Sequence, residues 1–274
     1  MHPILFRLGS LNIYTYGFFV AIGFILGFFI AVRRGREEGI PFERTVDLLF
    51  CIILSAIIGS RSLFVLVNFE HYRDYPLHIF RIWEGGLVFY GGLILAVAVS
   101  FGYLRWNRLP VWKFADLFSP SIALGLFFGR IGCFFAGCCY GKETSLPWGV
   151  TFIDPNSLAR LNLSLHPTQI YEALGSLAIF FFLNWKRRRR TFEGQIFYLF
   201  LLLYSSLRFM IEFLRDDPRG FLLGGILSTS QGIGIFLAIV SFFMLFYLKR
   251  ERRRQKGGCF RDPEISPSPF EETM

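Results

Sequence analysis

Charged residues are scarce in this chain. Asp, Glu, Lys and Arg make up 18% of its 274 residues, whereas a water-soluble domain carries about 25%. Hydrophobic residues make up 53%, and phenylalanine alone occurs 35 times. This many apolar side chains would need more polar surface than the charges provide. The composition therefore excludes most classes of soluble domain and indicates a protein that folds in lipid.

Several motifs that would carry cofactor or metal chemistry are also missing. The sequence has neither a Walker sequence nor a G-x-G-x-x-G or G-x-S-x-G element. The four histidines do not form H-E-x-x-H, and Cys133-x-x-x-x-Cys138-Cys139 lacks the two-residue gap and the second pair of a zinc site. Five cysteines are too few and too uneven for a disulfide scaffold. The sequence thus predicts no metal and no cofactor.

The formal net charge of +9 raises the question of a nucleic-acid partner. The basic residues, however, form short clusters between long apolar runs, without the interleaved aromatics that line a nucleic-acid groove. This placement is typical of charges at the edge of a membrane. We therefore expect no nucleic acid to bind.

A helix that crosses about 30 Å of hydrocarbon needs roughly 20 mostly apolar residues, and seven stretches meet this requirement. The expected fold is an all-α polytopic membrane protein of seven transmembrane helices around a lipid-accessible polar cavity, within residues 1–248. The stretches run from Tyr14 to Val32, Thr45 to Val67, Gly86 to Tyr103, Ala115 to Gly137, Pro167 to Trp185, Gly194 to Leu214 and Gly225 to Leu248.

The basic residues of the connections predict the orientation of these helices. One set of connections holds nineteen Lys and Arg residues and the other set holds seven. Cytoplasmic loops carry the excess of positive charge, so the amino terminus is expected outside and the carboxyl terminus in the cytoplasm. Residues 249–274 are basic and then rich in Pro, Ser and Glu, which predicts a disordered cytoplasmic tail.

Ionisable residues within the apolar stretches are candidates for function because they are costly in lipid. One polar stripe, spaced for a single helix face, consists of Tyr204, Arg208, Glu212 and Arg215. Its Arg208 and Glu212 could simply lock two helices by a salt bridge, or the guanidinium could grip a phosphate. Arg130 lies on a different stretch. Two inward-facing arginines on separate helices would form a positive site for a phospholipid head group.

Other polar side chains invite two interpretations each. His166, Gln169 and Glu172 follow Pro167 at three-residue intervals, which suits either a helix start or hydrogen bonds to a head group. Tyr16 and Tyr90 each stand beside glycine. A tyrosine in a membrane helix is usually a packing residue or an interfacial anchor, but these two phenols could also contact a substrate.

Six motifs in order make a specific combination. They are Tyr14-Thr-Tyr16-Gly17, Gly59-Ser-Arg61, Gly85-Gly86 to Gly91-Gly92, Gly129-Arg130-Ile-Gly132, His166-Pro167-Thr168-Gln169-x-Tyr171-Glu172, and Tyr204-x-x-x-Arg208-x-x-x-Glu212-x-x-Arg215. From about Pro3 to Leu248 the chain resembles the prolipoprotein diacylglyceryl transferases, which are seven-helix enzymes of the bacterial inner membrane.

The resemblance implies a reaction and a set of roles. Members of this family transfer the diacylglyceryl group of phosphatidylglycerol to the lipobox cysteine of a prolipoprotein signal peptide, forming a thioether and releasing glycerol phosphate. It implies that Arg130 and Arg208 bind phosphatidylglycerol. Tyr16, His166 and Gln169 would be further substrate-binding residues, and Tyr204, Arg208 and Glu212 would act in catalysis. The implied location is the inner membrane, with several spans.

The chain also departs from the family pattern. Cys133 stands where Asn is usual, Cys138 stands near the position of a usual Glu, and Tyr90 replaces a frequent His. Our hypothesis is that the two arginines clamp the phosphodiester while Tyr90 or Glu212 helps to remove the thiol proton. The alternative function is a channel or carrier for a small anion with the arginines as its filter, although no internal repeat supports it.

Overall fold

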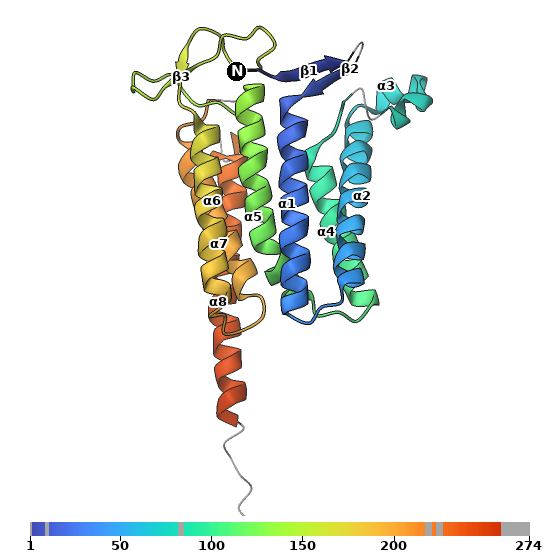
Figure 1. Cartoon of the computed structure of the whole chain (residues 1–274), viewed down its shortest axis with the longest axis vertical. Helices are drawn as coiled ribbons and strands as arrows, with labels where there is room; N and C mark the ends of the chain where they lie inside the picture. The colour runs from blue at the N-terminus through green and yellow to red at the C-terminus, as the bar shows by residue number, and fades with distance from the viewer. Residues whose placement is uncertain (1, 9–10, 82–84, 217–220, 223–226, 259–274) are drawn as a thin grey trace, which may run out of the picture.

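The computed structural model is a bundle of long helices, and it describes residues 2–8, 11–81, 85–216, 221–222 and 227–258. The long helices run nearly parallel to one axis (Figure 1). They are α1 (Thr15–Glu37), α2 (Phe42–Val67), α4 (Phe89–Trp106), α5 (Val111–Ala136), α6 (Thr168–Arg187), α7 (Gln195–Glu212) and α8 (Thr229–Gly258).

Six of these helices are long and apolar enough to cross a membrane. The seventh expected span corresponds to α6, which is 20 residues long and lies beside α5 and α7 in the bundle (Figure 1). The hydropathy of α6 is lower than that of the other long helices because its buried face carries polar residues. These are Thr168, Gln169, Glu172 and Ser176. The all-helical fold with several membrane spans is as expected. That α6 forms a seventh span stays a prediction.

Small residues let the helices approach closely. Gly59 of α2 and Gly91 of α4 face each other so tightly that a Cβ on either would collide with the carbonyl of the other. Gly23 and Gly27 of α1 lie in van der Waals contact with Gly125 and Ser121 of α5, less tightly than the first pair. Close contact between small residues is the usual way in which membrane helices pack.

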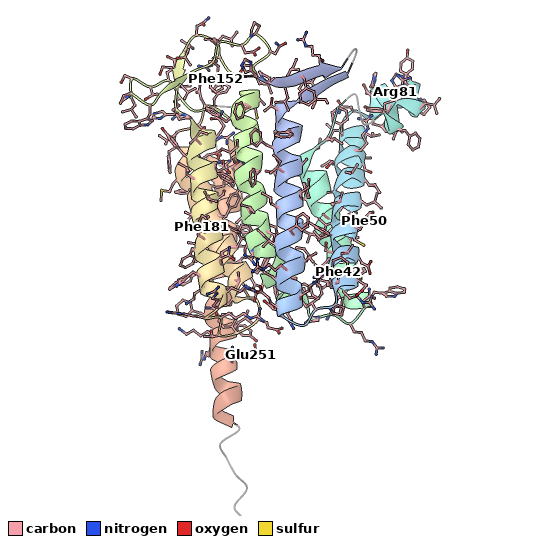
Figure 2. The ribbon with its side chains drawn as sticks, in the orientation of Figure 1. Phe42, Phe50, Arg81, Phe152, Phe181 and Glu251 are labelled. Carbon is pink, nitrogen blue, oxygen red and sulfur yellow. The ribbon has the colours of Figure 1, made fainter. Side chains whose placement is uncertain are left out.

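Large apolar side chains cover the outside of the bundle. Phe50 of α2 and Phe181 of α6 are 72% and 61% exposed and project away from the other helices (Figure 2). Exposed phenylalanines in such numbers would be unfavourable in water, whereas lipid tails solvate them. The outer surface therefore fits a bilayer.

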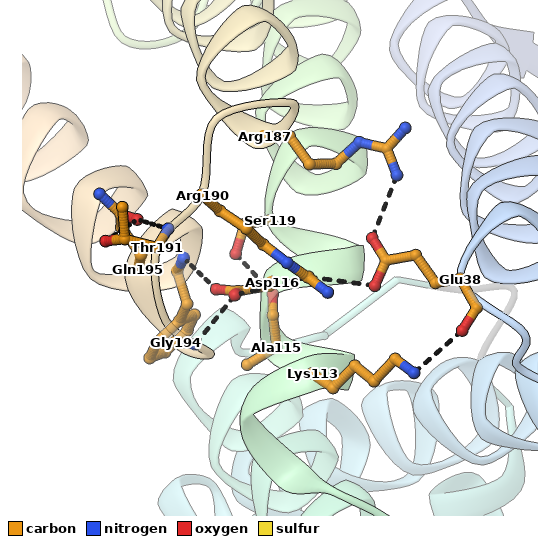
Figure 3. A network of polar contacts seen from close by, with 11 residues as sticks. Glu38, Lys113, Ala115, Asp116, Ser119, Arg187, Arg190, Thr191, Gly194 and Gln195 are labelled. Carbon is orange, nitrogen blue, oxygen red and sulfur yellow. Dashed lines mark hydrogen bonds and ion pairs between the residues drawn. The ribbon is translucent and has the colours of Figure 1, made fainter. Parts of the chain in front are cut away.

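A polar network ties the helices together at one end of the bundle (Figure 3). Arg187 and Arg190 form ion pairs with Glu38, at 3.1 Å and 3.0 Å. Asp116 of α5 accepts hydrogen bonds from the backbone N–H groups of Gly194 and Phe197, at 2.8 Å and 2.9 Å. Because these N–H groups belong to the N-cap residue and the first turn of α7, Asp116 caps that helix from a neighbouring one.

The opposite end carries short elements that the hydropathy pattern did not indicate (Figure 1). They are the hairpin of β1 (Ile4–Leu8) and β2 (Leu11–Tyr14), helix α3 (Phe69–Asp74), the 3-10 helix Pro76–Phe80, the pair β3 (Val150–Thr151) and β4 (Ser164–Leu165), and the pair β5 (Phe221–Leu222) and β6 (Leu227–Ser228).

Beyond residue 248 the chain continues as helix. Helix α8 runs to Gly258 and extends past the other helices (Figure 1). The expected disordered tail thus begins with helical residues, and positions 259–274 lie outside the described residues.

Candidate active site

One buried carboxylate is the centre of the intramembrane polar cluster. Glu172 on α6 has no exposed side-chain surface. Its Oε1 lies 2.9 Å from Nη2 of Arg130 on α5 and accepts a hydrogen bond of 2.8 Å from the hydroxyl of Tyr204 on α7. Three helices therefore meet at a single oxygen atom.

The second oxygen of Glu172 faces two more guanidinium groups. Oε2 lies 3.8 Å from Nη1 of Arg208 and 3.8 Å from Nη1 of Arg215. Nη2 of Arg208 also binds Oε2 of Glu212 at 2.9 Å, and the other oxygen of Glu212 accepts a 2.8 Å hydrogen bond from Ser228. The cluster thus places three cations around two carboxylates.

The helical spacing of the sequence produces this arrangement. Tyr204, Arg208 and Glu212 are four residues apart on α7, so they share one face. The ring of Tyr204 stacks on that of Phe200, with 5.8 Å between the centroids, which fixes the hydroxyl towards Glu172. The structure brings Arg130 and Arg208 together from separate helices, but they meet on Glu172 with only 16% and 11% of their side chains exposed. Both guanidinium groups are therefore engaged with a buried carboxylate.

Gln169 and His166 lie at the start of α6, beside the loop that follows α5. Nε2 of the buried Gln169 donates to the carbonyl of Cys138 at 2.8 Å, and its Oε1 is buried with no hydrogen-bond partner. Nδ1 of His166 is 3.4 Å from the hydroxyl of Tyr171. In the described chain, no ion pair or hydrogen bond joins His166 to the arginine cluster.

The two phenols of the sequence prediction occupy different surroundings. Tyr16, at the start of α1, packs its backbone and ring against Gly132 of α5, two residues after Arg130. Tyr90, at the start of α4, is half exposed and pairs edge-on with the ring of Phe89. Over the described residues, no hydrogen bond connects Tyr90 to the cluster around Glu172.

Comparison with known proteins identifies the family. Residues 3–247 match the family model of the prolipoprotein diacylglyceryl transferases. The chain belongs to this family. It is 37% identical to the phosphatidylglycerol–prolipoprotein diacylglyceryl transferase of Clostridium tetani, over 93% of this chain and 100% of that protein. It is 35% identical to transferase 2 of Clostridium perfringens, over 94% and 99%, and 34% identical to a Vibrio cholerae transferase of the same name, over 95% and 94%.

Within this member of the diacylglyceryl transferase family, sequence reasoning missed the central residue. The sequence suggested a helix start or hydrogen bonds to a head group for Glu172, and Glu172 was not selected as a site residue, although its three-residue spacing from Gln169 placed it on the same buried face. Arg215 was noted in the polar stripe but was not selected as a site residue. A rule that every buried arginine requires a carboxylate or another acceptor would have pointed to Glu172.

Arg61, also in a membrane-spanning helix, binds backbone carbonyls and no carboxylate in the described chain. Its guanidinium donates to the backbone carbonyls of His78, Ile79, Gly85 and Gly86, at 2.6 to 3.2 Å. All three nitrogens are therefore used to hold the segment that follows α3. In this transferase, Arg61 of α2 has a structural role, because it holds the segment after α3 in place. It lies outside the cluster around Glu172.

Proposed function

We propose that this chain transfers the diacylglyceryl group of phosphatidylglycerol to the lipobox cysteine of prolipoproteins, releases glycerol phosphate, and so performs the first step of lipoprotein maturation. Beyond family membership, one observation carries this proposal. Nη1 of Arg208 is buried without a hydrogen-bond partner, in a cluster that already contains Arg130. A buried donor without an acceptor is unfavourable, and a phosphodiester oxygen would satisfy it.

The reaction requires a stabilised leaving group. A sulfur atom attacks the glyceryl carbon that bears the phosphate, the C–O bond breaks, and negative charge develops on the departing phosphate oxygen. A guanidinium stays protonated and matches a phosphate by two parallel hydrogen bonds. We assign this role to Arg130 and Arg208. Interactions aimed at charge that develops during the reaction contribute strongly to catalysis.

The neighbours of the arginines act by positioning. Glu212, held by Ser228, orients Arg208, and Tyr204 orients Glu172. In the resting state Glu172 occupies the place that we assign to the phosphate, and it keeps the three guanidinium groups from repelling one another. When the lipid binds, its phosphodiester replaces part of this interaction.

The remaining predicted residues are assigned to the head group and its surroundings. Oε1 of Gln169 is a buried acceptor without a donor, and the glycerol head group carries hydroxyl donors. Tyr16 lies near Arg130 and is 46% exposed, which supports a role at the entrance. His166 and Tyr90 are assigned to the edge of the site, with Tyr90 as a hydrogen-bonding phenol towards the second substrate.

We further propose seven spans in the bacterial inner membrane, with the amino terminus outside. The excess of Lys and Arg at the end of the bundle that carries Arg187 and Arg190 supports this orientation. The ends of α5 and α7 that carry Arg130 and Arg208 then lie towards the outer leaflet. A signal peptide that presents its cysteine near the outer surface can reach them.

The direct test uses the purified chain in detergent with phosphatidylglycerol labelled in its glyceride part and a synthetic lipobox peptide. We expect label on the peptide and release of glycerol phosphate. A peptide with Ser in place of Cys should remain unlabelled, as should reactions supplied only with phosphatidylethanolamine. Absence of transfer from phosphatidylglycerol by protein that is folded and monodisperse would refute the proposal.

A further inference from the structure

Three thiols come together at the end of α5. The sulfur atoms of Cys133, Cys138 and Cys139 all lie within 4.8 Å of one another, and no disulfide joins them in the described chain. The linear spacing predicted no metal site, but the chain reverses in the loop. Gly137 and Cys139 adopt left-handed backbone conformations, with φ of +76° and +64°, and these turn Cys138 and Cys139 back over Cys133.

The loop that carries two of these thiols is firmly held by α6. The carbonyl of Cys138 accepts a 2.8 Å hydrogen bond from Gln169, and the carbonyl of Cys139 accepts a 2.8 Å hydrogen bond from Thr168. Both donors are at most 1% exposed. The sulfur atoms are therefore brought together by a fixed backbone, which is the support that a ligand set requires.

The geometry suits a zinc ion. Zinc–sulfur bonds are about 2.3 Å long, so the sulfurs of a tetrahedral site lie about 3.8 Å apart. The thiols could reach this separation with side-chain movements of about 1 Å. A set of three protein ligands with a fourth position open is typical of catalytic zinc, whereas structural zinc has four protein ligands.

The thiols also lie beside the proposed phosphate site. Arg130 precedes Cys133 by three residues, so both share one face of α5. The carbonyls of Cys138 and Cys139 are held by Gln169 and Thr168, which lie about one turn before Glu172 on α6, and Glu172 binds Arg130. A nucleophile bound to a zinc ion on the three thiols would thus be close to the phosphodiester that we assign to the arginines.

We propose that Cys133, Cys138 and Cys139 bind one Zn²⁺, whose open position takes the thiol of the prolipoprotein cysteine. This inference rests on the proposed transferase function. Zinc coordination deprotonates a thiol, and the proton passes to water. The thiolate then attacks the glyceryl carbon, a C–S bond forms, the C–O bond breaks, and its electron pair leaves with glycerol phosphate. No oxidant or reductant is required, because zinc has no redox chemistry.

The site would supply what the cluster around Glu172 lacks. Glu212 is engaged with Arg208 and Ser228, and over the described residues the half-exposed Tyr90 makes no hydrogen bond to the cluster. Neither side chain is therefore placed as a general base for a thiol. Activation of a nucleophile by metal coordination does not need a general base of matched pKa.

Metal analysis of the purified protein, prepared under reducing conditions with zinc and then dialysed, is the first test. We expect close to one zinc per wild-type chain, and loss of that zinc in Cys138→Ser. The matched control is Cys51→Ser, because Cys51 lies on α2 outside the thiol cluster, and it should retain the metal. We expect transfer to fall about 100-fold or more in Cys138→Ser and to be unchanged in Cys51→Ser.

Cobalt substitution tests the site without relying on any variant or on turnover. Wild-type protein loaded with Co²⁺ should show sulfur-to-cobalt charge-transfer absorption and the intense visible bands of a tetrahedral ion. A lipobox peptide should shift these bands, and its Cys→Ser counterpart should not. Failure of reduced, folded protein to retain zinc or cobalt would overturn the proposal. Detection of copper, or of a disulfide between two of the three cysteines, in place of zinc would overturn it as well. Unshifted bands would refute thiol binding. A zinc-loaded protein that fails to transfer lipid would instead contradict the transferase function.

Discussion

Replacement of Arg208 by Lys separates the charge of this residue from its shape. Lysine keeps the positive charge but offers a single nitrogen, whereas Arg208 uses Nη2 for Glu212 and turns Nη1 towards Glu172. The lysine nitrogen can hold the carboxylate or face a phosphate, but it cannot form both contacts in the same geometry. The substitution should therefore remove one charge-assisted hydrogen bond from the reacting phosphodiester.

The size of the effect follows from that lost bond. Hydrogen bonds to charged groups contribute about 1.5–3 kcal/mol, and each 1.36 kcal/mol of transition-state stabilisation changes a rate by about tenfold. We therefore expect Arg208→Lys to reduce transfer about 10- to 150-fold. Because the charge stays opposite Glu172 and Glu212, the thermal unfolding temperature should change much less than it would with an uncharged replacement.

The assay is transfer of labelled glyceride from phosphatidylglycerol to a lipobox peptide, measured as kcat and KM for the lipid. Arg33→Lys is the matched control, because the side chain of Arg33 is 85% exposed and pairs across one turn with Glu37. It should behave as the wild type. Wild-type rates in Arg208→Lys, or an equal loss in Arg33→Lys, would contradict the clamp.

Three further substitutions test the neighbouring groups. Glu172→Gln keeps an acceptor for Tyr204 but leaves three guanidinium groups around an uncharged amide, so we expect the free energy of unfolding to fall by about 3–5 kcal/mol in detergent unfolding experiments, and unaltered stability would contradict the central role of Glu172. Tyr90→Phe should raise KM for the peptide with no change in the shape of the pH–rate profile from pH 6 to 9, and a changed profile would show a proton-transfer role for the phenol. Arg61→Gln should lower the free energy of unfolding by about 3 kcal/mol, because several backbone carbonyls lose their hydrogen-bond donor. The kcat of the folded fraction should stay normal. A selective loss of kcat would show that Arg61 takes part in the reaction.

Much of the fold could be predicted because lipid imposes a simple rule. A helix must be about 20 residues long and apolar to cross the hydrocarbon, and the helices α1, α2, α4, α5, α7 and α8 follow that pattern. The short elements at one end, including the β1–β2 hairpin, do not obey it. Most of their residues lie outside the apolar stretches, so hydropathy carries little signal for them.

The candidate site divides in the same way. Residues on one helix could be grouped by spacing, which is why Tyr204, Arg208 and Glu212 were predicted to share a face. Contacts between helices could not be grouped, because spacing says nothing about which faces meet. Glu172 and the three thiols both depend on such contacts, in one case between α5, α6 and α7 and in the other across the loop after α5.

The closed arrangement around Glu172 places a condition on substrate binding. A buried ion pair gains little stability overall, but loss of one partner is costly, so the guanidinium groups can leave Glu172 only when another anion arrives. Phosphatidylglycerol brings one negative charge in its phosphodiester, which can take over part of the contacts that Arg130 and Arg208 make with Glu172. A zwitterionic lipid also carries a phosphate, but its ammonium group would enter the same cationic cluster and be repelled. The lipid preference of the enzyme should therefore originate in the charge of this cluster, and it should weaken when Arg215, which follows the end of α7 by three residues, is replaced by Gln.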